Sequence, residues 1–252
     1  MPKLIILGTS NAIPTEGHEN THMLLVGEQR IVLIDCPDNP LLRFQKVEVD
    51  FNLLSDLVLT HFHPDHVSGV PQLLMNMWLM GRSRPLNIYG LDHTLDRIEN
   101  LMGFYSWSEW PNFFQVTFHR LPAQEMVPVL ECSEFRILAA PVKHIIPTIG
   151  LRIDFSKSKK GLAYTSDTEP CPQVLRLANG VDVLIHEASG ALPGHSSAVQ
   201  AGLAATQGET GMLYLIHYPT GQFARGDPVA EARVEYKGPV AMAEDFMTLS
   251  FD

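Results

Sequence analysis

The sequence predicts an α+β protein of 252 residues, organised as one domain over residues 1–252. Short apolar runs bounded by glycine or polar residues are typical of β-strands, and other segments repeat apolar residues at the three- and four-residue spacing of amphipathic helices. Hydrophobic residues make up 45% of the chain and charged residues 18%, so a chain of this length can bury a large core.

The first third of the chain is expected to contain four strands. Three apolar segments, Lys3–Leu7, His22–Val26 and Ile31–Asp35, predict consecutive strands, with a loop at Gly8–Pro14. The run Asp56–Thr60 is short, rich in branched residues and bounded by polar ones, which suits a strand in a sheet covered on both faces.

Four metal-ligand side chains follow this last strand. His61 and His63 lie two positions apart in extended chain and would point to the same side, and Pro64 would turn the chain so that Asp65 and His66 approach them. Imidazole and carboxylate ligands in one turn fit zinc or another borderline divalent ion better than calcium or magnesium. The alternative, a loop of solvated histidines, is disfavoured because the four residues are so close together.

The same segment carries a family resemblance. Thr60–His66, with the sequence Thr-His-Phe-His-Pro-Asp-His, resembles the T-H-x-H-x-D-H signature of the metallo-β-lactamase superfamily, and Leu7–Pro14 resembles the L-G-T-x-x-x-x-P start of its ribonuclease Z branch. This resemblance implies a single metallo-β-lactamase-like domain, a four-layer αββα sandwich with two metal ions at the edge of its two sheets. It also implies that Asp35 braces the metal loop, the alternative being a turn residue that ends a strand.

The middle of the chain alternates helical and strand patterns. Apolar spacing predicts a helix over Val70–Met80 that Gly81 ends, then a strand over Pro85–Gly90 and a helix capped by Asp92. The aromatic-rich stretch 104–114 suits either a lid or pocket wall, or ordinary core packing.

The second half is expected to build the second sheet. The predicted antiparallel strands are Val116–Leu121, Val127–Glu131 and Phe135–Ala140, and further strands are Gly161–Thr168, Val181–Glu187 and Met212–His217. Ser196 would cap a helix through Ala204, and Asp227 a last helix to about Tyr236. The tail 240–251 is expected to be a strand pair or coil.

The resemblance also implies a ligand set for two divalent metal ions, with zinc expected and manganese or iron as alternatives. Asp167 ends a segment, Tyr-Thr-Ser-Asp-Thr, that resembles the family's Y-[ST]-[GS]-D-T motif, and it would bridge the ions; a turn or cap role is the alternative. The ligands of one ion would be His61, His63 and His144, and those of the other Asp65, His66 and His217.

The remaining catalytic residues come from two short segments. The family resemblance implies that His195, in a segment similar to the family's H-S-T, donates a proton. It implies that Glu187, in the segment His186-Glu187-Ala188, orients His195, and that Asp65 is the third catalytic residue. A surface-loop histidine is the alternative reading of His195. These residues imply a dinuclear metal-dependent hydrolase, and we expect a phosphodiesterase that cleaves a small phosphodiester through a metal-bridging hydroxide.

Three other functions remain open: a ribonuclease Z-type tRNA 3′ endonuclease, a lactone or ester hydrolase, and a non-catalytic metal-binding module. Two departures count against tRNA processing. The chain between His144 and Asp167 holds two strands and the turn Ser156–Gly161, which leaves no room for the tRNA-binding arm of ribonuclease Z. In addition, Asp35–Pro40 lacks both glycines of that enzyme's D-C-G-E-G-T-Q segment.

Charge and composition bound the partners and the compartment. The formal net charge of −10 disfavours nucleic acid as a partner without excluding it. The three cysteines are far apart and odd in number, which favours reduced thiols, and the apolar run at the amino terminus is too short for a membrane span or a signal segment. We therefore expect a cytoplasmic protein without a membrane partner, and the family resemblance suggests a homodimer.

Overall fold

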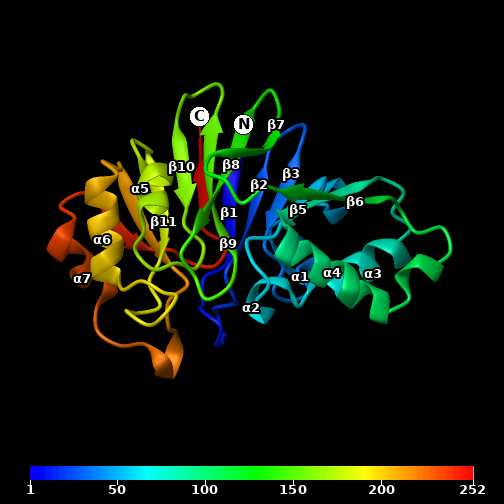
Figure 1. Ribbon diagram of the computed structural model, residues 1–252, viewed down its shortest axis with the longest axis horizontal. Coiled ribbons are helices and arrows are strands. Elements are labelled where there is room, and N and C mark those ends of the chain that lie inside the picture. The colour runs from blue at the N-terminus through cyan, green and yellow to red at the C-terminus, as the bar shows by residue number, and fades with distance from the viewer. Residues whose placement is uncertain (252) are drawn as a thin grey trace.

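A computed structural model describes residues 1–251 and shows two β-sheets packed face to face, with helices on both outer sides (Figure 1). Helices of the amino-terminal half cover one sheet, and helices of the carboxy-terminal half cover the other. This arrangement confirms the predicted four-layer αββα sandwich.

The first sheet contains seven strands of the described chain in the order β14-β1-β2-β3-β4-β5-β6. Strands β1, β2 and β3 pair antiparallel, whereas β3 to β6 pair parallel and are linked through helices on the outer face. The strand bounds are β1 Lys3–Gly8, β2 His22–Val26, β3 Ile31–Ile34, β4 Asp56–Val58, β5 Leu86–Leu91, β6 Val116–Leu121 and β14 Thr248–Ser250. The helices are α1 Leu41–Lys46, α2 Pro64–Val67, α3 Val70–Leu79 and α4 Asp92–Phe104, with short 3₁₀ turns η1 Phe51–Leu53 and η2 Trp107–Glu109.

The second sheet repeats this plan, with seven strands of residues 1–251 in the order β13-β12-β11-β10-β9-β8-β7. Strands β7 to β10 pair antiparallel and β10 to β13 pair parallel. The bounds are β7 Val127–Glu131, β8 Phe135–Val142, β9 Thr148–Phe155, β10 Gly161–Tyr164, β11 Val183–Glu187, β12 Met212–Ile216 and β13 Val240–Met242. The helices are α5 Pro172–Ala178, α6 Ala198–Gln207 and α7 Pro228–Glu235, and η3 is Gly221–Phe223.

Three hydrophobic clusters hold the two sheets and the two helical layers together. Alternate residues of β1 show the division, because Leu4 and Ile6 face the core between the sheets while Ile5 and Leu7 face helices α1 to α4. A third cluster, which includes Leu184 and Ala201, lies between the second sheet and helices α5 to α7. Successive strand residues therefore serve two different cores, as the two-residue period of a strand requires.

Several local expectations need correction. Strand β6 was expected in the second sheet, but it pairs in parallel with β5 of the first sheet, because α4 crosses over the sheet and returns the chain beside β5. Helix α6 is capped by Ser197, not Ser196, since the Ser197 hydroxyl accepts from the Gln200 amide while Ser196 bonds the Thr168 carbonyl. Helix α4 begins at Asp92, so Leu91 occupies the cap position.

The chain also forms elements that the sequence pattern missed. Helix α1 was not predicted, and the tail forms no pair of its own: β13 joins the second sheet beside β12 and β14 joins the first beside β1. Across residues 1–251, the structure contains no helix with the length and apolar character that crossing a membrane requires.

Candidate metal centre

The loop between β4 and α2 brings the first ligand candidates to the edge shared by the two sheets. Strand β4 ends at Val58, His61 and His63 follow in the loop, and Asp65 and His66 lie on α2, whose first residue is Pro64. Proline suits this position because a helix needs no N–H from its first residue.

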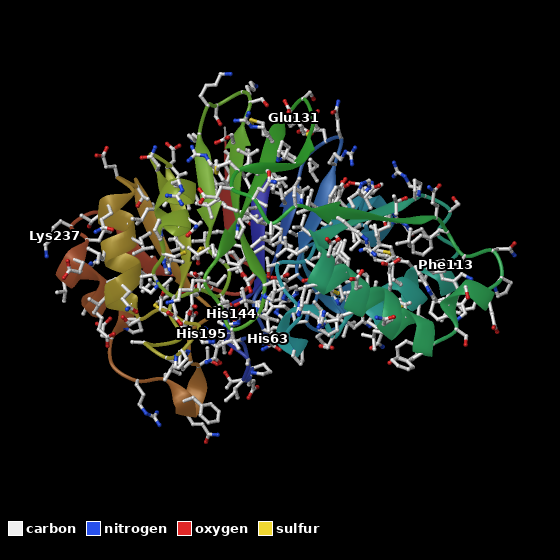
Figure 2. The ribbon with its side chains drawn as sticks, in the orientation of Figure 1. His63, Phe113, Glu131, His144, His195 and Lys237 are labelled. Carbon is white, nitrogen blue, oxygen red and sulfur yellow. The ribbon has the colours of Figure 1, made fainter. Side chains whose placement is uncertain are left out.

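Three later chain segments complete the cluster. His144 follows β8, Asp167 follows β10 and His217 follows β12, so each lies just beyond the carboxyl end of a strand. Figure 2 shows His63 and His144 together with His195 at the lower edge of the two sheets. The fold therefore gathers every predicted ligand from segments far apart in the sequence.

The ligand atoms form two groups that share Asp167. Site A consists of His61, His63, His144 and Asp167, and site B of Asp65, His66, Asp167 and His217; within each group the ligand atoms lie within 4.8 Å of one another. In site A, Nδ1 of His63 lies 3.1 Å from Nε2 of His61 and 3.1 Å from Nε2 of His144. In site B, Nε2 of His217 lies 3.2 Å from Oδ2 of Asp167.

In four of the five imidazoles, a hydrogen bond on the side away from the cluster selects the nitrogen that faces it. His66 donates from Nδ1 to Asp35 Oδ2 at 2.8 Å, and His144 donates from Nδ1 to the Gly194 carbonyl at 2.7 Å. The Thr60 hydroxyl donates to Asp35, so it accepts from Nδ1 of His61, at 3.0 Å.

His217 follows the same rule. Thr21 donates its hydroxyl hydrogen to the Ser10 carbonyl and therefore accepts from Nδ1 of His217 at 3.2 Å. Four imidazoles thus donate from Nδ1 and direct Nε2 at the cluster, which is how metal-binding histidines are oriented in proteins. Asp167 and Asp35 outweigh burial and raise the pKa of His66 well above its usual value, so a metal ion there would displace the proton on its Nε2. Thr60, Thr21 and Gly194 were not predicted; of these, only Thr60 lies in the recognised motif.

Burial and charge prepare these groups to bind cations. Burial holds the pKa of His61 well below its usual value and also lowers the pKa values of His63 and His144, so their imidazoles are neutral at neutral pH. Burial alone would raise the pKa of Asp167, but His217 and His66 outweigh it and hold that pKa well below its usual value. Asp167 is therefore a carboxylate with two oxygens facing two sites.

Two buried atoms of the cluster, which lie 3.5 Å from each other, make no hydrogen bond. His66 Nε2 and Asp167 Oδ1 are buried without a hydrogen bond, although unsatisfied polar atoms in a protein interior cost free energy. A divalent cation would satisfy both, and the mixed imidazole and carboxylate donors suit zinc-like ions. The residues present therefore fit two metal ions.

His195 and Glu187 lie beside the cluster as a hydrogen-bonded pair. His195 Nδ1 is 3.1 Å from Glu187 Oε1, and Glu187 is fully buried, with its carboxylate also accepting from the amides of Thr168 and Ser189. Burial lowers the pKa of His195, but the Glu187 carboxylate outweighs it and the net shift is upward. His186 lies outside both sites, and burial lowers its pKa to about 4.

Comparison with known proteins places this geometry in a family. The family model for Anti-Pycsar protein Apyc1 matches residues 2–226. The chain belongs to the Apyc1 family. This Apyc1 family member is also similar to ribonuclease Z of Methanothermobacter thermautotrophicus, at 25% identity over 305 residues that cover 99% of this chain and 96% of the relative. Ribonuclease Z of Mycolicibacterium gilvum is 30% identical over 256 residues, which cover 90% of this chain and 88% of that protein.

Solved structures share the fold of this Apyc1 family member. The metallo-β-lactamase fold protein YhfI from Bacillus subtilis has a TM-score of 0.82 at 20% identity and covers 98% of both chains. Human short-form tRNase Z has a TM-score of 0.78 at 23% identity over 99% of both chains. A diphosphatase of the PhnP family has a TM-score of 0.77 at 17% identity, covering 100% of this chain and 98% of that one.

These findings confirm the superfamily and its ribonuclease Z-like branch. The protein is a metal-dependent hydrolase with the metallo-β-lactamase fold, which implies two divalent metal ions.

Proposed function

We propose that the protein is a dinuclear metal-dependent phosphodiesterase that acts on a nucleotide-sized phosphodiester. The observation that carries the proposal is the combination of sites A and B with the Glu187–His195 pair at one edge of the fold. The match to the Apyc1 family model, which describes cyclic nucleotide phosphodiesterases, supports this substrate class.

The shape of the chain favours a small substrate over tRNA. Between His144 and Asp167 the chain forms β9, a tight turn closed by the Lys159 amide on the Phe155 carbonyl, and β10. The alignment with the Methanothermobacter ribonuclease Z spans 305 residues whereas this chain has 252, so the relative carries segments that have no counterpart here.

The chemistry follows from the groups at the edge. Two divalent cations at sites A and B would lower the pKa of a water molecule and offset negative charge on the phosphate. His195 donates from Nδ1 to Glu187, so its Nε2 is free to give a proton to the leaving oxygen as the phosphorus–oxygen bond breaks. Asp65, on the site B side, would accept the proton that the attacking water loses.

Four finer features belong to the same proposal. We expect zinc at both sites, with manganese or iron as alternatives, because the donors combine five imidazoles with two carboxylates. A homodimer, a cytoplasmic location and a single domain over residues 1–252 stay predictions.

The test combines metal analysis with a substrate panel. Purified protein should contain two divalent ions per chain and hydrolyse bis(p-nitrophenyl) phosphate and a cyclic nucleotide, and His63→Ala should abolish both activities. His119→Gln, on β6 away from the cluster, is the matched histidine control. Absence of bound metal, or unchanged activity in His63→Ala, would refute the proposal.

The second candidate is tRNA 3′ processing, which the similarity to ribonuclease Z proteins favours. A precursor tRNA in the same panel separates the two candidates. Faster turnover of the precursor, measured as kcat/KM, would establish ribonuclease Z activity, and faster turnover of p-nitrophenyl esters or lactones would establish the ester-hydrolase alternative. Full metal occupancy with no turnover would leave a metal-binding module.

A further inference from the structure

Glu169 connects the segments that carry His144 and His195. Its Oε1 accepts the Gly194 amide at 3.0 Å, and its Oε2 lies 2.6 Å from Nζ of Lys143. Gly194 immediately precedes His195, and Lys143 immediately precedes His144. One carboxylate is therefore bonded to the chain neighbours of two imidazoles at the centre.

The backbone reinforces this connection. The Glu169 amide donates to the Lys143 carbonyl at 2.7 Å, and the Lys143 amide donates to the Thr168 hydroxyl at 3.2 Å. From the other side, the Ser196 hydroxyl donates to the Thr168 carbonyl at 2.6 Å. Residues 143, 168–169 and 194–196 thus form one hydrogen-bonded frame around the Asp167 segment.

Gly194 makes the contact with His144 possible. Its φ is +84°, and a Cβ there would lie 2.8 Å from Nδ1 of His144, so only glycine permits this approach. The amide on one side of its Cα donates to Glu169, and the carbonyl on the other side accepts from His144. Glu169 thus fixes the peptide unit before the Gly194 Cα, and the His195 amide, which donates to the Leu192 carbonyl at 3.0 Å, fixes the unit after it that carries the carbonyl, so the two bonds together orient this permissive glycine toward His144.

We propose that Glu169 is a positioning residue of the metal centre, which holds the Gly194 peptide so that His144 presents Nε2 to site A and His195 stays against Glu187. Glu169 makes no direct bond to a ligand atom of site A or site B, nor to the substrate. It acts through Gly194, and its ion pair with Lys143 is secondary because both side chains are partly exposed, at 31% for Glu169 and 64% for Lys143.

The first test measures metal binding rather than turnover. Zn²⁺ is added to metal-free protein in competition with a chromophoric chelator. Wild-type protein should take up two ions, and Glu169→Ala should bind one of them about 10- to 100-fold more weakly, the usual effect of losing a partner that orients a ligand. The other ion, at site B, should bind with unchanged affinity.

Three further variants separate positioning from loss of a surface ion pair. Glu169→Gln keeps an oxygen for the Gly194 amide and should restore most of the affinity, and Lys143→Met keeps the carboxylate and should bind like wild type. Glu125→Ala removes a comparably exposed glutamate that pairs with Arg176 away from the site, and it should leave both affinities unchanged.

Kinetics and spectroscopy complete the test. With bis(p-nitrophenyl) phosphate at saturating Zn²⁺, Glu169→Ala should lose kcat more than KM, because His195 is misplaced while the ions are restored. Ring ¹⁵N shifts of His144 in the metal-free protein should show the Nδ1–H tautomer in wild type and a mixture in Glu169→Ala.

The outcomes also separate this inference from the proposed function on which it rests. Wild-type protein that binds no Zn²⁺ would end the proposed function and this inference together. Wild-type protein that binds two ions, with equal affinities in Glu169→Ala, would overturn the positioning role alone. If Glu169→Ala does not fold, the Zn²⁺ affinities of Glu169→Gln and Lys143→Met are compared instead. An equal loss of affinity in both variants would assign the effect to the ion pair and refute the role of the Gly194 contact.

Discussion

The substitution Asp35→Asn tests how the fold selects the metal-binding nitrogen of His66. Asp35 is fully buried and accepts three hydrogen bonds at 2.8 Å, from the Thr60 amide, the Thr60 hydroxyl and His66 Nδ1. Its φ is +62°, a conformation that asparagine tolerates as well as aspartate does. The change therefore replaces one acceptor oxygen by a donor with little disturbance of shape or backbone.

The magnitude follows from the geometry of the three bonds. In metal-free protein, the amide oxygen of asparagine can face the Thr60 amide while its NH₂ faces the Thr60 hydroxyl and His66 Nδ1. That arrangement moves the His66 proton to Nε2, and it leaves the Thr60 hydroxyl with His61 Nδ1 as its acceptor, which moves the His61 proton to Nε2 as well. A metal ion at site B needs an unprotonated Nε2, so binding returns the His66 proton to Nδ1. There it faces the NH₂ group of the new side chain, and a buried N–H is left without an acceptor, at a cost of about 1–3 kcal/mol. Since 1.4 kcal/mol is tenfold, Zn²⁺ affinity should fall roughly 10- to 100-fold.

Two measurements check this reasoning. Chelator competition gives the Zn²⁺ affinities, and urea unfolding of metal-free protein gives the stability, which should fall by about 1.5–3 kcal/mol because the neutral amide no longer supports the charged form of His66, whose pKa Asp167 and Asp35 hold well above its usual value. Asp38→Asn, the same change at an exposed position of the same loop, should affect neither quantity. Unchanged Zn²⁺ affinity in Asp35→Asn would refute the argument from the imidazole tautomer.

Two further predictions concern stability. Arg82 is 5% exposed and donates to the carbonyls of Asn52, Leu54, Arg84 and Pro85 at 2.6–3.0 Å. Arg82→Ala should lower the free energy of unfolding in urea by about 4 kcal/mol, at roughly 1 kcal/mol per lost hydrogen bond. The control Arg84→Ala, at an exposed position, should lower it by less than about 0.5 kcal/mol. A loss below about 1 kcal/mol in Arg82→Ala would show that these four hydrogen bonds do not stabilise the fold. Burial lowers the pKa of His186 from 6.5 to about 4, so in metal-free protein the stability that its neutral form contributes should be complete above pH 6.5, and about 3 kcal/mol of it should be lost as the pH falls to 4, in addition to the loss from His22, whose pKa burial also lowers to about 4. His186→Gln should flatten that slope; an unchanged slope would show that other groups cause it.

The local pattern predicted most of the strands and the ligand-bearing loop. The continuous apolar runs of β1 and of the segment before His61 reflect burial on both sheet faces. Partner choice was harder to predict, as β6 shows: its sequence suits either sheet, and only the crossover through α4 decides that it lies beside β5. The two tail strands separate because β13 returns through α7 to the preceding strand β12, whereas β14 pairs with β1 at the other end of the chain.

For the site, the sequence alone predicted which side chains gather at the edge of the sheets: His61, His63, Asp65 and His66 through their spacing, and His144, Asp167 and His217 through family motifs. Only the tertiary structure decided how these atoms are aimed. The tautomers of three imidazoles depend on an acceptor from another segment, namely Asp35 for His66, Gly194 for His144 and Thr21 for His217. A hydrogen bond between residues 31 or 50 positions apart leaves no periodic trace in the chain, because only folding brings its donor and acceptor together.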